Sequence, residues 1–263
     1  MSTDREMRAK EEALRRWFVR GCDPIDAEID GLDIGWGGIQ RWMTGILPLE
    51  ECRHHLDFAC GYATFVAQLA WRFPHLQIVG LNIDFEGPHA AAGPLTTEAG
   101  VAERCRFVQG DARSMPFSEA SFDSVSCFLG LQDIEIGFGD EGVRRALEEA
   151  DRVLKPGGVL AVAEEFTADR LRDLLGSLTV EKIAMHERAL DVRWDRAIAE
   201  RAIELYAQGY EAQVRSDDPR ARGRARRDAR TRWIQSMERQ LAECGAYVPF
   251  GPVRLAVARK KIA

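Results

Sequence analysis

The feature that most constrains the fold is a regular alternation of short apolar runs with helical stretches between residues 54 and 164. The apolar runs predict strands at 54–58, 77–81, 105–108, 122–129 and 159–164. Residues between them have helical spacing, which predicts helices at 63–72, 87–99 and 141–154. Wholly apolar strands that alternate with helices are typical of βαβ units on a buried parallel sheet. We therefore expect an α/β protein.

The flanking segments have a different pattern. Residues 3–20 predict an amphipathic helix, and residues 21–50 are irregular and rich in Gly and Trp. No strand is expected within 167–228, where Trp194, Ile198 and Leu205 recur at helical spacing. A further helix is expected at about 224–243. Alternating apolar residues after Gly251-Pro252 predict a final strand, and the turn favours an antiparallel direction for it.

Composition and charge exclude several classes of protein. The 263 residues carry a net charge of −6, which argues against general affinity for nucleic acid or anionic membranes. No apolar run reaches the ~18 residues that a membrane helix needs, and the charged N-terminus predicts no secretory signal. The six cysteines form no CxxC pair or zinc-finger spacing, so we expect free thiols, a cytoplasmic protein and no metal site.

The strongest local signal lies at residues 54–70, HHLDFACGYATFVAQLA. A strand ends at Asp57, a loop of small residues follows, and a helix begins. Small residues let the backbone approach a ligand, and the free N–H groups at the start of the helix can bind it. Asn82 and Asp111 end the next two strands, where they can bond a ribose hydroxyl and an exocyclic amine. This pattern predicts a nucleotide-type ligand at the carboxyl edge of the sheet.

The run of DxxCGxxT (57–64), GLN (80–82), GDARSMPF (110–117), FDSV (122–125) and RVLKPGG (152–158) resembles the class I S-adenosylmethionine-dependent methyltransferases, especially their small-molecule branch. The resemblance covers about residues 50–166 and the C-terminal strands. It implies a Rossmann-like seven-stranded mixed sheet with the last strand antiparallel and helices on both faces. It also implies S-adenosyl-L-methionine as cofactor, with its methionine part over residues 57–63, its ribose at Asn82 and its adenine at Asp111. The cofactor-binding residues expected on this basis are Asp57, Ala59, Gly61, Asn82, Ile83, Asp84, Gly110, Asp111, Ala112, Cys127 and Trp36.

The sequence departs from the family pattern at two places. Ala59 and Ala63 stand where the family usually has glycine, and we expect them to be tolerated if φ is negative at both. Asn82 replaces the acidic residue of the family, so it can bond the ribose without charge assistance. Asp84 can share that role.

Three residues are candidates for catalysis. His186 can act as a general base, although a histidine on a helix surface is the simpler interpretation. Asp133 follows the fourth strand, and capping or loop hydrogen bonding is its alternative role. Glu165 and its neighbour Glu164 end the fifth strand, and because they point to opposite faces, at most one of them points into a cleft. Methyl transfer to an already nucleophilic atom needs no base, because alignment and desolvation supply most of the rate.

The segment 215–232 contains eight arginines. A salt-bridged helix or a clamp for an anionic small molecule is favoured over contact with nucleic acid. We expect an N-terminal helix and lid at 1–50, in which Trp36 packs on a ligand. A methyltransferase domain is expected at 51–263, with a helical substrate cap inserted after strand five at about 167–228.

The sequence therefore predicts methyl transfer to a small-molecule acceptor, which can be anionic, on O, N or C by in-line displacement. An RNA or protein methyltransferase that docks through 215–232 remains an alternative, as does a non-catalytic cofactor-binding module. A homodimer also remains open.

Overall fold

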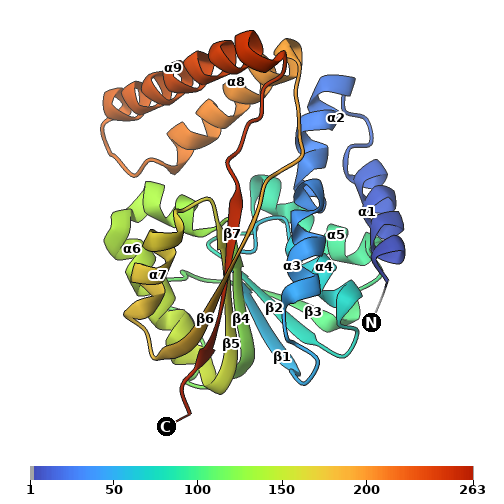
Figure 1. The fold of residues 1–263 in the computed structure, drawn as a ribbon, viewed down its shortest axis with the longest axis vertical. Helices are drawn as coiled ribbons and strands as arrows, with labels where there is room; N and C mark the ends of the chain where they lie inside the picture. The colour runs from blue at the N-terminus through green and yellow to red at the C-terminus, as the bar shows by residue number, and fades with distance from the viewer. Residues whose placement is uncertain (1–2, 263) are drawn as a thin grey trace.

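The computed structural model describes residues 3–262, and its centre is a seven-stranded sheet in the order β3-β2-β1-β4-β5-β7-β6 (Figure 1). The strands β1 to β5 are parallel, and β7 runs antiparallel between β5 and β6. The predicted fold class is thereby confirmed. The strands are β1 His54–Phe58, β2 Gln77–Asn82, β3 Cys105–Gln109, β4 Phe122–Phe128, β5 Leu154–Glu164, β6 Val180–Arg188 and β7 Val253–Lys260.

Helices cover both faces of the sheet. In Figure 1, α1, α3, α4 and α5 lie on one side, α6 and α7 lie on the other, and α8 and α9 form a pair at one end. The α-helices are α1 Asp4–Phe18, α2 Pro24–Asp30, α3 Ile39–Ile46, α4 Thr64–Arg72, α5 Ala92–Glu98, α6 Leu131–Val153, α7 Ala168–Gly176, α8 Arg196–Gln213 and α9 Pro219–Cys244. Short 3₁₀ turns are η1 Gly31–Asp33, η2 Trp36–Gly38, η3 Gly87–Ala91 and η4 Ala102–Arg104. None of the helices within residues 3–262 is long and apolar enough to cross a membrane.

Two apolar layers hold the sheet between the helices. Leu56 and Phe58 of β1 pack with α6 and α7 on one face, and Phe65 and Leu69 of α4 are buried on the other. Alternate residues of a strand point to opposite faces. His55 and Asp57, which alternate with Leu56 and Phe58, therefore face the α4 side, where they are also buried.

The prediction that residues 167–228 contain no strand is wrong, because they contain β6. Strand β6 is the edge strand, paired only with β7, and its sequence VEKIAMHER mixes charged and apolar residues. Charged edge strands are common, since charge discourages pairing with other chains. His186 consequently lies on a strand, opposite Leu255 of β7.

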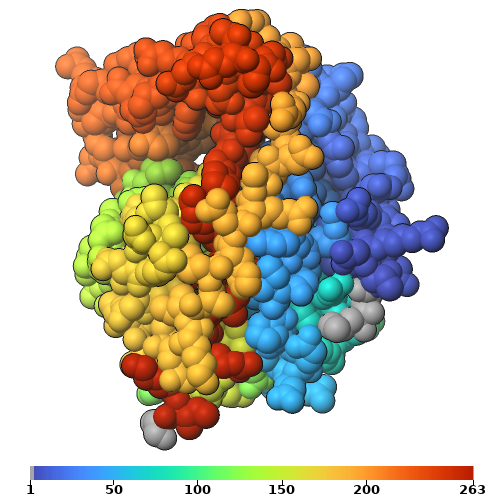
Figure 2. Space-filling view, in the orientation of Figure 1, coloured from blue at the N-terminus to red at the C-terminus, as the bar shows by residue number. Residues whose placement is uncertain are grey.

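The helical insertion also begins and ends later than predicted. The segment that follows β5 is α7 and then β6, both part of the sheet fold, and α8 and α9 lie between β6 and β7. Helix α8 ends at Gln213, and the Asp218-Pro219 pair starts α9, because the Asp218 carboxylate accepts a hydrogen bond from the Arg220 N–H. We call the α8–α9 pair the cap, and it is the orange to red-orange group at the top of Figure 2.

Candidate cofactor site

The loop between β1 and α4 has an unusual backbone conformation. The φ angle is +53° at Ala59, +50° at Gly61 and +65° at Ala63, so the expectation of negative φ at the two alanines is wrong. A left-handed conformation costs an L-alanine about 1–2 kcal/mol relative to glycine. Hydrogen bonds from the Cys60 N–H to the Leu81 carbonyl (3.1 Å) and from the Ala63 N–H to the Cys60 carbonyl (2.8 Å) hold the loop in this form. The loop therefore keeps a conformation suited to glycine although it carries alanine.

The loop forms one wall of a cavity of about 350 Å³ at the carboxyl ends of the parallel strands. The sequence-predicted residues that line this cavity are Ala59, Gly61, Asn82, Ile83, Asp84, Gly110, Asp111, Ala112 and Asp133. The structure thus brings together residues that are far apart in the chain. Their roles in cofactor binding stay a prediction.

Asn82 and Asp84 form one side of the cavity. The Asn82 side chain is nearly buried, and its Nδ2 donates a hydrogen bond of 2.8 Å to the Asp84 carbonyl. The Asp84 carboxylate lies 3.1 Å from Nδ1 of His89, and this hydrogen bond lowers the pKa of Asp84. Asn82 therefore fixes the loop that presents the Asp84 carboxylate.

Asp111 also lines the cavity, and Arg113 lies beside it. Both oxygens of the Asp111 carboxylate accept hydrogen bonds from the Arg113 guanidinium, which lowers the pKa of Asp111. The Arg113 guanidinium also lies 3.3 Å from the centre of the Phe138 ring, and the Arg215 guanidinium lies 5.1 Å from it. This part of the cavity thus combines the Asp111 carboxylate, the Phe138 ring and the Arg215 guanidinium, and Arg113 pairs with Asp111 beside it.

The first half of α6 and the end of α8 close the cavity. Nε2 of Gln213, the last residue of α8, donates a hydrogen bond of 2.9 Å to Asp133. The Asp133 side chain is open to the cavity. The surrounding protein desolvates its charged form, which raises the pKa of Asp133 to about 6. Asp133 is therefore a site-lining acid that can hold a proton near neutral pH.

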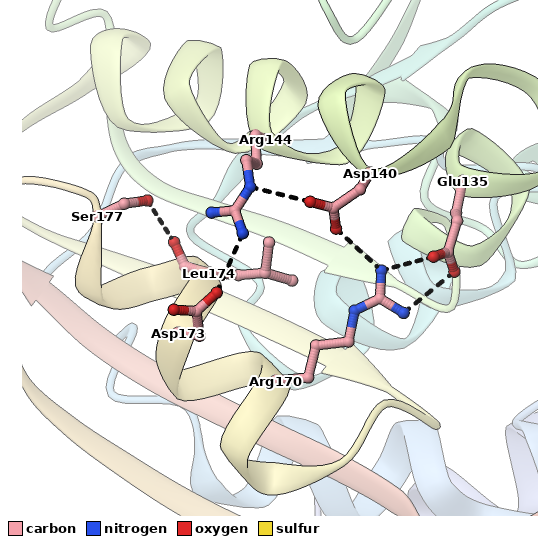
Figure 3. Close-up of polar contacts among 7 residues, drawn as sticks. All are labelled: Glu135, Asp140, Arg144, Arg170, Asp173, Leu174 and Ser177. Carbon is pink, nitrogen blue, oxygen red and sulfur yellow. Dashed lines mark hydrogen bonds and ion pairs between the residues drawn. The ribbon is translucent and has the colours of Figure 1, made fainter.

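A network of ion pairs supports this half of α6 from outside (Figure 3). Arg170 of α7 donates to Glu135 and Asp140, and Arg144 donates to Asp140 and to Asp173 of α7. At Gly139, between these acids, φ is +67° and ψ is −172°, so α6 bends there. The network therefore fixes the segment that carries Asp133, Gly137 and Phe138 against α7.

We expect Arg170→Gln to weaken ligand binding in this cavity about two- to fivefold, since an exposed ion-pair network contributes up to about 1 kcal/mol. Arg172→Gln is the matched control, because Arg172 is exposed and, among residues 3–262, its one ion pair is with Asp169 of its own helix. Calorimetric titration of both variants with S-adenosylhomocysteine checks this. Equal affinities would show that the network does not position α6.

Two predicted cofactor residues, Asp57 and Cys127, lie beneath the cavity and do not line it. The Asp57 carboxylate accepts a hydrogen bond of 2.5 Å from Ser126, whose hydroxyl also lies 2.8 Å from Nε2 of His55. Burial raises the pKa of Asp57 to about 7 and lowers the pKa of His55 to about 3. Asp57 therefore supports the loop from a buried polar chain.

The structure separates the remaining predicted residues from the cavity. Trp36 is buried with φ of +43°, and its ring contacts Phe128 and Phe250. Glu165 accepts a hydrogen bond from the Gly251 N–H. His186 is half-buried on the edge strand and does not line the cavity, so its predicted role finds no geometric support.

The sequence reasoning missed the cavity residues His89, Gly130, Ile134, Gly137, Phe138, Ala212, Gln213 and Arg215. Gly130 could have been predicted from the sequence, since it follows the fourth predicted strand as Gly110 follows the third. Arg215 begins the Arg-rich segment but was not assigned to the cofactor. Within residues 3–262, no group of three or more His, Cys, Asp or Glu residues is arranged to hold a metal ion.

The strand order, with β7 antiparallel between β5 and β6, is that of the Rossmann-like methyltransferase fold, and the cavity lies at the carboxyl ends of its parallel strands. Residues 56–162 match the family model described as a methyltransferase domain. The matched residues run from β1 to β5, the part of the chain that carries the predicted methyltransferase motifs.

Curated relatives share this part of the chain. Demethylmenaquinone methyltransferase of Deinococcus radiodurans is 33% identical over 139 residues, which are 51% of this chain and 51% of the relative. Ubiquinone/menaquinone biosynthesis C-methyltransferase UbiE of Paracoccus denitrificans is 32% identical over 137 residues, 50% of this chain and 52% of the relative. The chain therefore spans about half the length of these relatives.

Among solved structures, the [4+2]-cyclase SpnF matches 86% of this chain and 82% of its own, with a TM-score of 0.57 and 19% identity. This likeness shows the fold alone.

Proposed function

We propose that the protein transfers the methyl group of S-adenosyl-L-methionine to a small-molecule acceptor. The observation that carries the proposal is the cavity between the left-handed loop 59–63 and the cap. Its volume of about 350 Å³ lies within the ~300–1,000 Å³ of typical ligand sites. The acids Asp84, Asp111 and Asp133 line it, which suits a ligand that carries an ammonium and a sulfonium group.

The chain's own residues would hold the cofactor in an extended form. The loop 59–63 would receive the methionine part, Asn82 and Asp84 the ribose, and Asp111 the adenine amine. The bound cofactor supplies an electrophilic methyl group. Gln213 and Arg215 cover the cavity from the cap, so they would exclude water from the transfer and keep the cofactor in place.

The acceptor is proposed to be a small molecule because the relatives are named for methylation of small molecules. The Arg-rich segment gives less support to an RNA or protein substrate. Arg226 pairs with Glu204 and Glu211 within the cap, and Arg215 lines the cofactor cavity. All six cysteines are free thiols, which suits the reducing cytoplasm, and we include that location in the proposal.

Two measurements test the function together. Calorimetry must show binding of S-adenosyl-L-methionine, and incubation of the complex with candidate acceptors must release S-adenosylhomocysteine. Binding without turnover on any acceptor would favour a non-catalytic cofactor-binding module. Absence of binding would exclude methyl transfer from this cofactor.

We expect Asp111→Asn to weaken cofactor binding about tenfold, because one hydrogen bond that involves a charged group contributes about 1–2 kcal/mol. Arg113→Gln separates a direct contact from an indirect one. If Asp111 acts only by holding Arg113, calorimetry will give both variants the same loss of affinity. If Asp111 binds the adenine amine itself, Arg113→Gln will lose much less.

A further inference from the structure

A second group of side chains, outside the cofactor cavity, gathers aromatic rings from several parts of the chain. The Trp36 ring lies 6.0 Å from the Phe128 ring and 4.9 Å from the Phe250 ring, between ring centres. Phe250 in turn lies 5.7 Å from Tyr206 and 6.5 Å from Trp194. We call these five residues the aromatic cluster. It joins the lid segment, the end of β4, helix α8 and the segments that precede α8 and β7.

The aromatic cluster adjoins the cofactor cavity on the side of the loop 59–63. Phe128 lies two residues before Gly130, which lines the cavity. Tyr62 follows Gly61, another lining residue, and its ring centre lies 5.8 Å from that of His89, which also lines the cavity. A molecule on the cluster would therefore approach the end of the cavity assigned to the methionine part of the cofactor.

Three polar side chains, one in the cluster and two beside it, have no side-chain hydrogen-bond partner in the part of the chain that the structure describes. Asp33, Tyr62 and Tyr206 neither donate nor accept a side-chain hydrogen bond within residues 3–262, and each is only half-buried. Yet burial raises the pKa of Asp33 to about 7 and that of Tyr62 to about 12, and Asp33 contributes to the shifts of both tyrosines. They thus lie deep in the molecule and still expose their oxygens. Apolar walls with a few convergent, unpaired polar groups are typical of ligand sites.

The electrostatics of this region disfavour an anion. The one charged group that contributes to the pKa of Asp33 is another acid, Asp30, and no cation offsets it among residues 3–262. The arginines of the cap pair with groups other than Asp33, and Arg201 of α8 forms an ion pair with Asp26 of α2. Arg222 donates to the Ser216 carbonyl, Arg226 pairs with acids of α8, and Arg220 and Arg227 are exposed.

Resting on the proposed function, we infer that the aromatic cluster, with Asp33, Tyr62 and Tyr206, is the acceptor site. The site takes a flat, ring-bearing molecule that is uncharged or cationic and that presents an O–H or N–H group to the Asp33 carboxylate. The rings supply stacking contacts, and the carboxylate supplies a strong acceptor. An aryl carboxylate or phosphate is disfavoured wherever Asp33 is ionised, because the two negative charges would then face each other without a counter-ion.

Three probes with the same ring system test this inference by calorimetry at about pH 8, where Asp33 is mostly ionised, in the presence of saturating S-adenosylhomocysteine: naphthol, naphthylmethylammonium and naphthoate. We expect naphthol and the ammonium to bind at least about tenfold more tightly than naphthoate, since like charges in a desolvated site repel strongly. Asp33→Asn should abolish this preference by weakening the ammonium and strengthening naphthoate. Asp228→Asn is the control, because Asp228 is an exposed acid of the cap, and it should change nothing.

Tyr206→Phe provides a second variant if Asp33→Asn does not fold, and it should weaken naphthol while leaving cofactor affinity unchanged. Naphthoate binding as tightly as the other probes would overturn the inference. So would failure of naphthol and the ammonium to bind, or an unaltered preference in folded Asp33→Asn. A protein that shows the preference but does not bind S-adenosyl-L-methionine would contradict the proposed function and leave the charge selectivity of the cluster established.

Discussion

Asp57→Asn is expected to make the folded protein more stable than the wild type at neutral pH, by up to about 4 kcal/mol. The wild-type carboxyl has a pKa of about 7 when folded because it is buried, against about 3.9 in an unfolded chain. Between these values the unfolded state has released the proton and the folded state has not. The free energy of unfolding therefore falls by about 1.4 kcal/mol per pH unit as pH rises from about 4 to 7.

The asparagine variant lacks this term, so its stability relative to the wild type should rise over the same range and level off above pH 7. Urea unfolding between pH 4 and pH 8 measures the difference. Below pH 4 the two proteins should agree within about 1 kcal/mol, because an amide oxygen can still accept the Ser126 hydrogen bond. A constant difference across the range would mean that Asp57 is already ionised in the folded protein.

His55 gives the opposite dependence on pH and serves as an internal check. Burial lowers the pKa of His55 to about 3, whereas an unfolded histidine titrates near 6.5. As pH falls from about 6.5 to 3, the unfolded state gains a proton that the folded state does not, so this term removes stability. The terms from Asp57 and His55 therefore cancel between about pH 4 and 6.5. In Asp57→Asn the His55 term is no longer offset, and the variant should lose stability steeply on acidification.

The buried hydrogen bonds that link Asp57, Ser126 and His55 show what could be predicted from the sequence and what could not. The strands β1 to β5 were identified from apolar runs, and the candidate residues at the ends of β1, β2 and β3 lie around one cavity. Asp57 was expected to face the ligand because it ends a strand. In the parallel pairing of β1 with β4, Asp57 lies beside Ser126 instead. The two side chains therefore share one buried face of the sheet. That pairing depends on residues 69 positions apart and has no local signal.

Strand β6 was missed for a different physical reason. An edge strand has one neighbour and a half-exposed surface, so VEKIAMHER lacks the apolar run that marks a central strand. The contacts of Gln213 and Arg215 with the cavity were missed because they depend on how the cap folds back over α6. Helical periodicity predicts the cap helices but not their position relative to the sheet.

The conformation of the loop 59–63 could not be predicted from the sequence either, because an alanine in the sequence does not indicate a positive φ angle. The structure gives a reason why alanine occupies position 59. A β-carbon built on Gly130 would collide with the Ala59 Cβ and would lie 3.0 Å from the Cys127 Sγ. The space between the loop 59–63 and the start of α6 therefore holds one methyl group, and the Ala59 Cβ occupies it.

Gly130→Ala is accordingly expected to lower the free energy of unfolding by about 2–3 kcal/mol, the usual cost of overpacking, and to weaken cofactor binding by at least about tenfold. The added methyl group must push the loop 59–63 toward the cavity, because Cys127 and the β4 backbone are buried and cannot move easily. Urea unfolding and calorimetric titration with S-adenosylhomocysteine measure the two losses.

Ala59→Gly should rescue that variant, because it removes the atom with which the new methyl group collides and also relieves the positive φ at position 59. The double variant should regain most of the stability and affinity, with a coupling energy of about 1–3 kcal/mol between the two sites. Ala63→Gly is the matched control, since Ala63 has the same backbone strain but does not lie among the atoms nearest to a Gly130 Cβ. If Ala63→Gly rescues Gly130→Ala as well as Ala59→Gly does, relief of strain in the loop is the cause, and the steric pairing of Ala59 with Gly130 is wrong.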